Sequence, residues 1–234
     1  MFAASQGKAM SHTKVWERVQ AAGVVAVLVI DRAEDAIPLA EALLAGGVDA
    51  MELTLRTPSA LDALAAIRAR VPAMMAGVGT ILTPAQVRQV VEAGGSFGVA
   101  PGTNPRVLEE AARVGLPFGP GVCTPSDVER ALEYDCRVLK FFPAEPSGGL
   151  PFLQSMAAPY GHLGLRYVPL GGVTEANAGR YLADPLVAAV GGSWLAPRSA
   201  VQQGRWDEIR ASAARAIAVR DAARASTGQP GGKR

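Results

Sequence analysis

The chain has 234 residues, of which 49% are hydrophobic and 19% are charged, and its formal net charge is +2. This length suffices for one large domain with a substantial core, and a small net charge without basic blocks disfavours nucleic acid as a partner. No apolar run approaches the roughly 20 residues of a membrane span, and the N-terminus lacks the apolar segment of a signal peptide. We therefore expect a cytoplasmic protein that does not bind membranes.

Apolar, β-branched runs alternate along the chain with Ala/Leu-rich helical segments. Continuous apolar runs of this kind are typical of strands buried on both faces of a parallel sheet. Thr-Pro or Asn-Pro pairs mark the starts of four predicted helices, at residues 57, 83, 104 and 124. The predicted strands are 24–30, 50–54, 73–78, 96–100, 117–119, 137–142, 165–170 and 186–190. Helices are predicted at 11–22 and 33–45, from 57 to 70, after 84, after 105, and at 125–134, 149–157, 174–183 and 206–224.

Eight strands, each followed by a helix within about 220 residues, match the count and scale of a TIM (β/α)8 barrel. A doubly wound open sheet is the alternative. No low-complexity linker interrupts the pattern, so we expect a single domain over residues 1–234. The segments 1–10 and 226–234 are predicted to be flexible ends.

The strand at 137–142 places Lys140 among apolar residues. Burying an unpaired ammonium group is costly, and a neutral lysine amine is a nucleophile for carbonyl carbons. The chain has only four lysines against nineteen arginines, and the other three lysines lie near the chain ends. Arginine cannot deprotonate in a protein, whereas lysine can. Lys140 is therefore a candidate nucleophile, and a snorkelling or edge-strand lysine is the alternative.

A second polar group follows the strand at 50–54. Side chains alternate along a strand, so Glu52, Thr54 and Arg56 share one face. If this face and that of Lys140 both point into the barrel, Glu52 meets Lys140 there. Neither of the two histidines, His12 and His162, lies at a predicted strand end, so Glu52 is the candidate acid/base. A structural Glu–Arg pair is the alternative.

Glycine-rich turns follow three of the predicted strands: Gly79-Thr80, Gly171-Gly172 and Gly191-Gly192-Ser193. The last two occur after strands seven and eight, where TIM barrels often bind phosphate with backbone N–H groups. We favour a phosphate cradle there, with turns that bind no ligand as the alternative.

The two cysteines, Cys123 and Cys136, lack any spacing typical of a zinc site, so no metal is expected. In a reducing cytoplasm we expect free thiols, with a disulfide as the alternative.

Seven stretches, in family order between about residues 20 and 210, resemble the bacterial 2-keto-3-deoxy-6-phosphogluconate (KDPG) aldolases, which overlap with the 4-hydroxy-2-oxoglutarate (KHG) aldolases. The stretches are Ala45-Gly46-Gly47-Val48, Met51-Glu52-Leu53-Thr54-Leu55-Arg56-Thr57, Gly77-Val78-Gly79-Thr80, Ala100-Pro101-Gly102, Lys140-Phe141-Phe142-Pro143-Ala144-Glu145, Gly171-Gly172-Val173 and Gly191-Gly192-Ser193-Trp194-Leu195.

The resemblance implies a class I aldolase on a TIM barrel. Such an enzyme is a homotrimer without metal or cofactor, and it cleaves KDPG to pyruvate and glyceraldehyde 3-phosphate in the Entner–Doudoroff pathway. Lys140 resembles the Schiff-base lysine and Glu52 the general acid/base. The implied substrate-binding positions are Arg56 and Thr80 for the pyruvate carboxylate, Pro101 and Phe142 as pocket walls, and Gly171, Gly172, Gly192 and Ser193 at the phosphate.

Two departures from the family pattern stand out. Leu170 occupies a substrate-binding position that is commonly Thr, or Val in galactonate-type relatives, so the preference for gluco-configured, galacto-configured or KHG substrates stays open. Arg56 favours the gluconate type. Asp31-Arg32 replaces a more basic pair, with no predicted consequence. A phosphate-binding isomerase and a sugar-phosphate-binding barrel without turnover are the competing functions.

Overall fold

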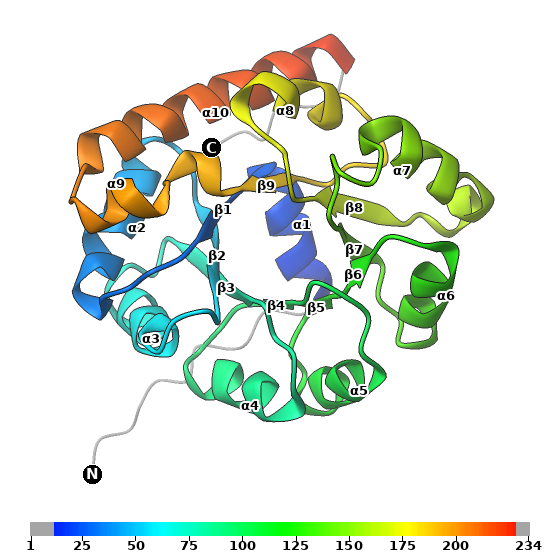
Figure 1. Ribbon diagram of the computed structural model, residues 1–234, viewed down its shortest axis with the longest axis horizontal. Helices are drawn as coiled ribbons and strands as arrows, with labels where there is room; N and C mark the ends of the chain where they lie inside the picture. The colour runs from blue at the N-terminus through cyan, green and yellow to red at the C-terminus, as the bar shows by residue number, and fades with distance from the viewer. Residues whose placement is uncertain (1–11, 228–234) are drawn as a thin grey trace.

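The computed structural model describes residues 12–227 and has a central ring of strands with helices around it (Figure 1). The strands are β1 (Val24–Leu28), β2 (Ala50–Thr54), β3 (Met75–Gly79), β4 (Gly98–Val99), β5 (Phe118–Gly119), β6 (Gly121–Val122), β7 (Val138–Phe141), β8 (Arg166–Pro169) and β9 (Val190–Gly192). The α-helices are α1 (His12–Ala22), α2 (Ala36–Ala45), α3 (Ala60–Arg70), α4 (Pro84–Glu92), α5 (Pro105–Val114), α6 (Pro125–Glu133), α7 (Gly149–Ala157), α8 (Glu175–Leu182), α9 (Arg198–Gln202) and α10 (Trp206–Thr227). Short 3-10 helices η1 (Ala33–Asp35), η2 (Ala158–Leu163) and η3 (Ser193–Leu195) complete the order.

All paired strands are parallel, in the orders β5-β4-β3-β2-β1-β9 and β6-β7-β8. β5 and β6 are two halves of one strand on either side of Pro120, which has no N–H to donate. At the other seam Tyr167 of β8 pairs with Val187, ahead of β9. The Tyr167 N–H donates to the Leu186 carbonyl and the Ala188 N–H to the Tyr167 carbonyl, both at 2.8 Å. The two sheets therefore close into one eight-stranded barrel, and the predicted TIM fold is confirmed.

The boundaries of several elements differ from the prediction. The strand predicted at 186–190 forms only a bridge at Val187 before the chain crosses to pair β9 with β1. Helix α9 has five residues, too few for a helical period to be recognised in the sequence. Helix α10 continues through Ser226 and Thr227, so the prediction of a loose tail is wrong there. The rest of that tail and the predicted flexible segment 1–10 lie outside the described residues.

Two apolar clusters divide the interior. The larger cluster lies between the outward faces of the strands and the surrounding helices, as parallel strands covered by helices require. The smaller one lies inside the barrel, where Val15 and Val19 of α1 pack with Phe97 and with inward residues of the strands. Helix α1 therefore closes the N-terminal end of the barrel, and Figure 1 shows it behind the ring.

Helix α10 holds α1 in this position. Arg220 donates to the Ala22 carbonyl at 2.9 Å and Arg224 donates to the Ala21 carbonyl at 2.8 Å, in the last turn of α1. These carbonyls have no partners within their own helix, and positive charge is favourable at a helix C-terminus. Between residues 12 and 227 no helix combines the length and apolar character needed to cross a membrane.

Candidate active site

A cavity of about 220 Å³ is lined by residues from seven of the strands and the turns that follow them. All eleven candidate site residues line it: Glu52, Arg56, Thr80, Pro101, Lys140, Phe142, Leu170, Gly171, Gly172, Gly192 and Ser193. Five further residues line the same space, namely Val27, Val29, Thr54, Val173 and Gly191. Gly191 belongs to the glycine turn predicted as a phosphate cradle, and strand alternation had placed Thr54 on the same face as Glu52 without assigning it to binding. Val27, Val29 and Val173 were not expected as lining residues, because an apolar position in or after a strand looks like ordinary core.

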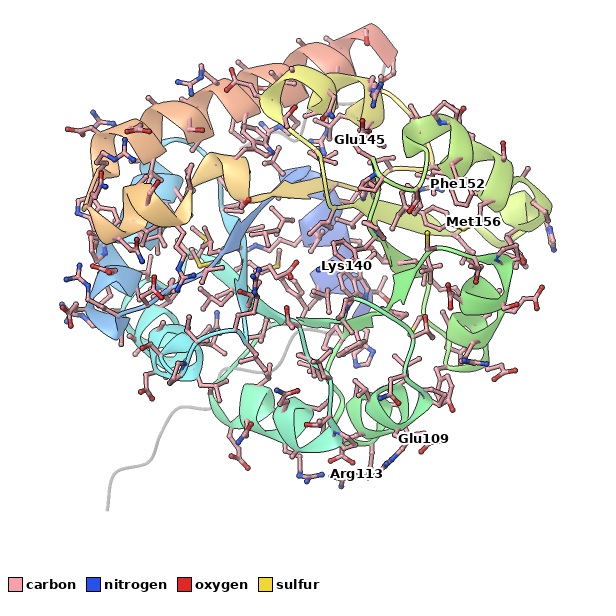
Figure 2. The ribbon with its side chains drawn as sticks, viewed as in Figure 1. Glu109, Arg113, Lys140, Glu145, Phe152 and Met156 are labelled. Carbon is pink, nitrogen blue, oxygen red and sulfur yellow. The ribbon has the colours of Figure 1, made fainter. Side chains whose placement is uncertain are left out.

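Lys140 points into the middle of the ring from β7 (Figure 2). Its Nζ donates a hydrogen bond to Glu52 Oε1 across the barrel at 3.0 Å, and both residues are buried, with exposed fractions of 7% and 3%. The Phe142 ring centroid lies 5.6 Å from Nζ, a cation–π distance. The two side chains meet as predicted, because both lie on the faces of β2 and β7 that point into the barrel, as the alternation of side chains along each strand indicated. Each charge compensates the other, which a buried ionic group requires.

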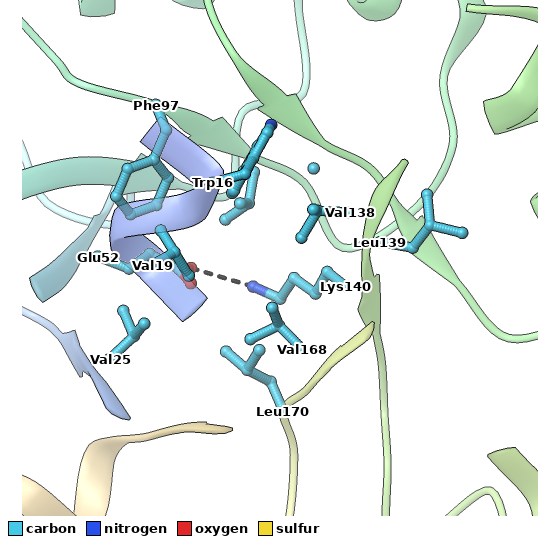
Figure 3. A pocket seen from close by; sticks show the side chains of 12 residues that line it. Trp16, Val19, Val25, Glu52, Phe97, Val138, Leu139, Lys140, Val168 and Leu170 are labelled. Atoms are coloured by element: carbon cyan, nitrogen blue, oxygen red, sulfur yellow. Dashed lines mark hydrogen bonds and ion pairs between the residues drawn. The ribbon is translucent and has the colours of Figure 1, made fainter. Parts of the chain in front are cut away.

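The Lys140–Glu52 pair rests on an apolar floor (Figure 3). Val19 and Trp16 of α1, with Phe97 and Val25, surround a small space of about 20 Å³ directly against the pair. The polar side chains Thr54, Arg56, Thr80 and Ser193 line the larger cavity, which also reaches the pair. The amine and carboxylate therefore lie where a protein-dominated, low-dielectric environment borders an opening for a small molecule.

Arg56 and Thr80 lie at the exits of β2 and β3. Among residues 12–227 Arg56 forms no ion pair, so the alternative of a structural Glu52–Arg56 pair does not apply. Thr80 has φ 61°, a left-handed conformation that is unusual for a β-branched residue. Such outliers are concentrated at functional sites, where the surrounding structure holds them in place. The exposed guanidinium and the Thr80 hydroxyl suit a carboxylate ligand at this end of the cavity.

The opposite end of the cavity is built mainly of glycine. Gly171 and Gly172 have φ 92° and 85°, which L side chains rarely adopt. A Cβ at Gly172 would also lie 2.6 Å from the Glu145 Cβ. The residues lining this end are Gly171, Gly172, Val173, Gly191, Gly192 and Ser193, none of which carries a cationic side chain. Backbone N–H groups and the Ser193 hydroxyl are the groups it offers to an anion.

The loop after β7 is bonded to this glycine turn. The Ala144 N–H donates to the Leu170 carbonyl at 2.7 Å, and the Glu145 N–H donates to the Gly171 carbonyl at 2.9 Å. Arg180, at 2.6 Å, and Tyr181 both donate to the Glu145 carboxylate, which ties the loop to α8. The Tyr181 hydrogen bond, more than any other contact, lowers the pKa of Glu145. The strand that carries Lys140 and the glycine turn are thus held in one arrangement.

Comparison with known proteins agrees with this geometry. A sequence model of the KDPG and KHG aldolase family matches residues 15–212. The KHG/KDPG aldolase of Escherichia coli strain K12 is 42% identical over 194 residues, which are 83% of this chain and 90% of that protein. The chain belongs to the KDPG and KHG aldolase family. Aldolases are carbon–carbon lyases, so the chain is assigned to that class of enzyme.

Solved structures of family members superpose on this aldolase. KDPG aldolase from Legionella pneumophila, with pyruvate captured at low pH as a covalent carbinolamine, is 38% identical with a TM-score of 0.81, covering 85% of this chain and 96% of that one. The Zymomonas mobilis ZM4 KDPG aldolase with 3-phosphoglycerate is 40% identical with a TM-score of 0.80, covering 89% and 95%.

Leu170 of the aldolase lies between the two ends of the cavity. Its side chain is 5% exposed and borders both the cavity and the apolar floor. It packs on Gly191, where a Cβ would lie 3.0 Å from the Leu170 Cγ. An aliphatic side chain here offers no hydroxyl to a substrate beside Lys140. The Leu170 side chain therefore shapes the cavity and offers it no hydrogen bond.

Asp31 and Arg32 of the aldolase, which follow β1, each form an ion pair. Asp31 accepts from Arg198 at 2.9 and 2.5 Å and from Gln202 at 2.8 Å, which joins the end of β1 to α9. The hydrogen bond from Arg198 is the largest cause that lowers the pKa of Asp31 to about 2. Arg32 instead pairs with Asp35 in its own turn at 2.8 Å.

Neither cysteine lines the cavity. Cys123 and Cys136 are free, and burial raises the pKa of Cys136 to about 11. The described part of the chain holds no group of three His, Cys, Asp or Glu side chains that could bind a metal ion.

Proposed function

We propose that this protein is a class I aldolase that cleaves KDPG to pyruvate and glyceraldehyde 3-phosphate through a Schiff base on Lys140. The observation that carries the proposal is the buried contact of 3.0 Å between Lys140 Nζ and Glu52 Oε1 at the wall of the cavity. A lysine amine beside a carboxylate has both the nucleophile and the proton carrier that imine formation needs. The covalent pyruvate adduct in the Legionella relative supports the same chemistry.

Imine formation begins with transfer of a proton from Lys140 to Glu52. The neutral amine attacks the C2 carbonyl of the keto acid, whose oxygen takes the proton from Glu52, and Glu52 then takes a proton from the nitrogen to leave a neutral carbinolamine. Glu52 then protonates the departing hydroxyl, and loss of water leaves a protonated imine. Acid/base assistance of this kind is typically worth ~10²–10⁴-fold in rate.

Carbon–carbon cleavage uses the imine as an electron sink. Glu52 removes the proton of the C4 hydroxyl, the C3–C4 bond breaks, and its electron pair moves into the C3–C2 bond of an enamine as the iminium is neutralised. Glyceraldehyde 3-phosphate leaves. Glu52 returns the proton to C3, and water hydrolyses the imine to release pyruvate and Lys140.

The other residues hold the substrate for these steps. Arg56 and Thr80 bind the pyruvate carboxylate, with the planar guanidinium suited to two parallel hydrogen bonds. Pro101 and Phe142 flank the reacting carbons. Gly171, Gly172, Gly192 and Ser193 bind the phosphate. Leu170 contacts the middle of the substrate.

Borohydride trapping tests the proposal. Incubation with pyruvate and borohydride should leave a reduced adduct on the peptide that contains Lys140, identified by mass spectrometry. Lys140→Arg keeps the charge but removes the nucleophile, so it should abolish both the adduct and turnover. Lys14→Arg, the same substitution on α1, should change neither. An adduct at another residue, or none at all, contradicts the proposed reaction.

Cleavage of 4-hydroxy-2-oxoglutarate is a second candidate activity, favoured by the double name of the Escherichia coli relative. A lactate-dehydrogenase-coupled assay of pyruvate release on KDPG, its galacto-configured isomer and 4-hydroxy-2-oxoglutarate would rank the three. We expect KDPG to have the highest kcat/KM, since Arg56 is present. Binding without pyruvate release would instead indicate a non-catalytic sugar-phosphate-binding barrel.

We further propose that the protein works as a single-domain homotrimer in the cytoplasm, without a cofactor. The family resemblance supports the trimer, and the free state of Cys123 and Cys136 fits a reducing compartment. Native mass spectrometry should give a mass three times that of the 24.2 kDa chain. A monomer at micromolar concentration would contradict the proposed assembly.

A further inference from the structure

The carboxylate of Glu52 lies over the backbone of the neighbouring strand. In the β2–β3 register Glu52 is the partner of Gly77, and Thr54 is the partner of Gly79. Nevertheless the Glu52 side chain reaches along the barrel to Gly79, two residues nearer the C-terminal ends of the strands. A Cβ at Gly79 would lie 2.5 Å from the Glu52 Cδ, 2.8 Å from its Cγ, and closer still to Oε1.

Space, and not backbone conformation, explains the glycine at this position. Gly79 is absent from the described glycines that have positive φ, so any residue can adopt its backbone geometry. The same inward face of β3 also contains Gly77, where a Cβ would lie 2.5 Å from the Phe97 Cδ2. The two glycines therefore accommodate two different groups. Gly77 leaves room for the aromatic ring of the floor, and Gly79 leaves room for the carboxylate.

The other neighbours of the carboxylate leave it little freedom. Lys140 Nζ holds Oε1 at 3.0 Å from the opposite side of the barrel. Below it are Phe97 and Val19, whose apolar side chains cannot hydrogen-bond, and Trp16, whose bulky ring fills the floor. A side chain on β3 at this level would move the carboxylate toward the substrate space or away from Lys140.

We propose that Gly79 is a positioning residue whose missing side chain forms the seat of the Glu52 carboxylate. The seat sets the distance from Glu52 to Lys140 and directs the carboxylate toward the reacting carbons of the substrate. This inference rests on the proposed aldolase function, in which Glu52 moves the protons.

Gly79→Ala tests the seat, and Gly102→Ala is its matched control. Gly102 adjoins Pro101 at the cavity, and a Cβ there would meet nothing within 4 Å. Deuterium exchange at C3 of pyruvate, followed by NMR, reports proton transfer by Glu52 without any C–C bond cleavage. In Gly79→Ala we expect this exchange and kcat to fall about 100-fold with KM changed less than about threefold. Gly102→Ala should keep the wild-type values.

The Glu52→Asp variant distinguishes a seat for the Glu52 carboxylate from a general packing effect of the methyl group added at Gly79. The shorter aspartate side chain withdraws the carboxylate from β3. Adding Gly79→Ala to Glu52→Asp should therefore lower the exchange rate less than about threefold, whereas Gly79→Ala in the wild-type protein lowers it about 100-fold. The inference is overturned if Gly79→Ala lowers the exchange rate by the same factor in the wild-type and Glu52→Asp proteins, or if Gly79→Ala exchanges at the wild-type rate.

If Gly79→Ala does not fold, the folding of the double variant tests the seat instead. If Gly79→Ala alone fails to fold by circular dichroism, a folded Glu52→Asp/Gly79→Ala protein supports the seat, and an unfolded double variant overturns it. Wild-type protein that forms no borohydride adduct on Lys140 would contradict the aldolase reaction itself. Normal trapping in the wild type with an unaffected Gly79→Ala variant would contradict the seat alone.

Discussion

At the residue scale, the site depends on two groups that are each unfavourable alone. A buried ammonium and a buried carboxylate both lose hydration, and Lys140 and Glu52 are tolerated because each compensates the other at 3.0 Å. In the proposed reaction, the same contact that stabilises the pair in the free enzyme is the path along which a proton leaves the amine. Stability and reactivity are therefore linked in these two residues.

Removing one charge of the pair should destabilise the fold. Lys140→Met leaves Glu52 buried without a counter-charge, and we expect the free energy of unfolding to fall by about 3–5 kcal/mol. Lys140→Met/Glu52→Gln should recover most of this loss because no buried charge remains. Urea unfolding at neutral pH measures both variants. Equal losses in the single and double variants would mean that packing, and not charge, dominates.

Thr80 holds a backbone conformation that costs the fold free energy. A β-branched residue at φ 61° carries about 1–3 kcal/mol of strain, whereas glycine carries almost none. We expect Thr80→Gly to raise the free energy of unfolding by about 1 kcal/mol and to lower kcat/KM at least tenfold. Thr103→Gly is the control, because Thr103 lacks positive φ and its hydroxyl donates to the Gly121 carbonyl at 2.8 Å. A loss of stability in Thr80→Gly would refute the strain.

At the element scale, the mouth of the barrel is held together by contacts between loops. Asp31, just after β1, is bound by Arg198 and Gln202 of α9. Helix α9 follows η3, which begins with Ser193. The Asp31–Arg198 pair thus links the first strand to the segment that completes the glycine-lined end of the cavity.

The Asp31–Arg198 pair should make stability depend on acid pH in a defined window. The pKa of Asp31 is lowered from 3.8 to about 2 in the folded protein. The ionised form is therefore favoured in the native state, so its stabilisation is fully present well above pH 3.8 and is lost as the pH falls toward 2.

Arg198→Gln tests this window. Urea unfolding should show wild-type protein more stable than the variant by a constant amount above about pH 5, and the difference should shrink as the pH falls through the acid window. Glu110, whose pKa is also about 2, titrates in both proteins and cancels in the comparison. A difference that does not vary between pH 5 and pH 2 would show that Asp31 is not the group responsible.

At the scale of the whole molecule, closure of the barrel builds one cavity from segments that are far apart in the sequence. The end with Arg56 and Thr80 lies at the exits of β2 and β3, and the glycine-lined end is formed by the turn after β8 and by the end of β9. Lys140 on β7 lies between them with α1 beneath it. A substrate that spans the cavity can thus be held at both ends while the middle reacts.

The two ends should be separable by mutation. Ser193→Ala removes one hydrogen bond to a phosphate, so we expect kcat/KM on KDPG to fall about 10-fold to 100-fold. Cleavage of the unphosphorylated analogue and borohydride trapping of pyruvate should not change, because neither uses that end. Ser199→Ala, on α9, is the control. A parallel loss on both substrates would indicate general damage to the site.

Much of the site was predictable because it depends on local patterns. Strand parity placed Glu52 and Lys140 on inward faces, and paired glycines marked turns that need positive φ at Gly171 and Gly172. Lining residues such as Val27 and Val29 were not distinguished, because valine is also an ordinary core residue. The last strand was misplaced because Val187 and Val190 are both apolar and only barrel closure assigns them to different neighbours.

The sequence by itself determined the number of strands, the faces they present and the choice of Lys140 as the candidate nucleophile, because these follow from alternation and residue type within a few positions. Only the tertiary structure decided that Glu52 rests over Gly79, that Leu170 packs on Gly191, and that Asp31 binds Arg198, 167 residues away. Such contacts depend on strand register and on closure of the ring, which join distant segments and which no local pattern encodes.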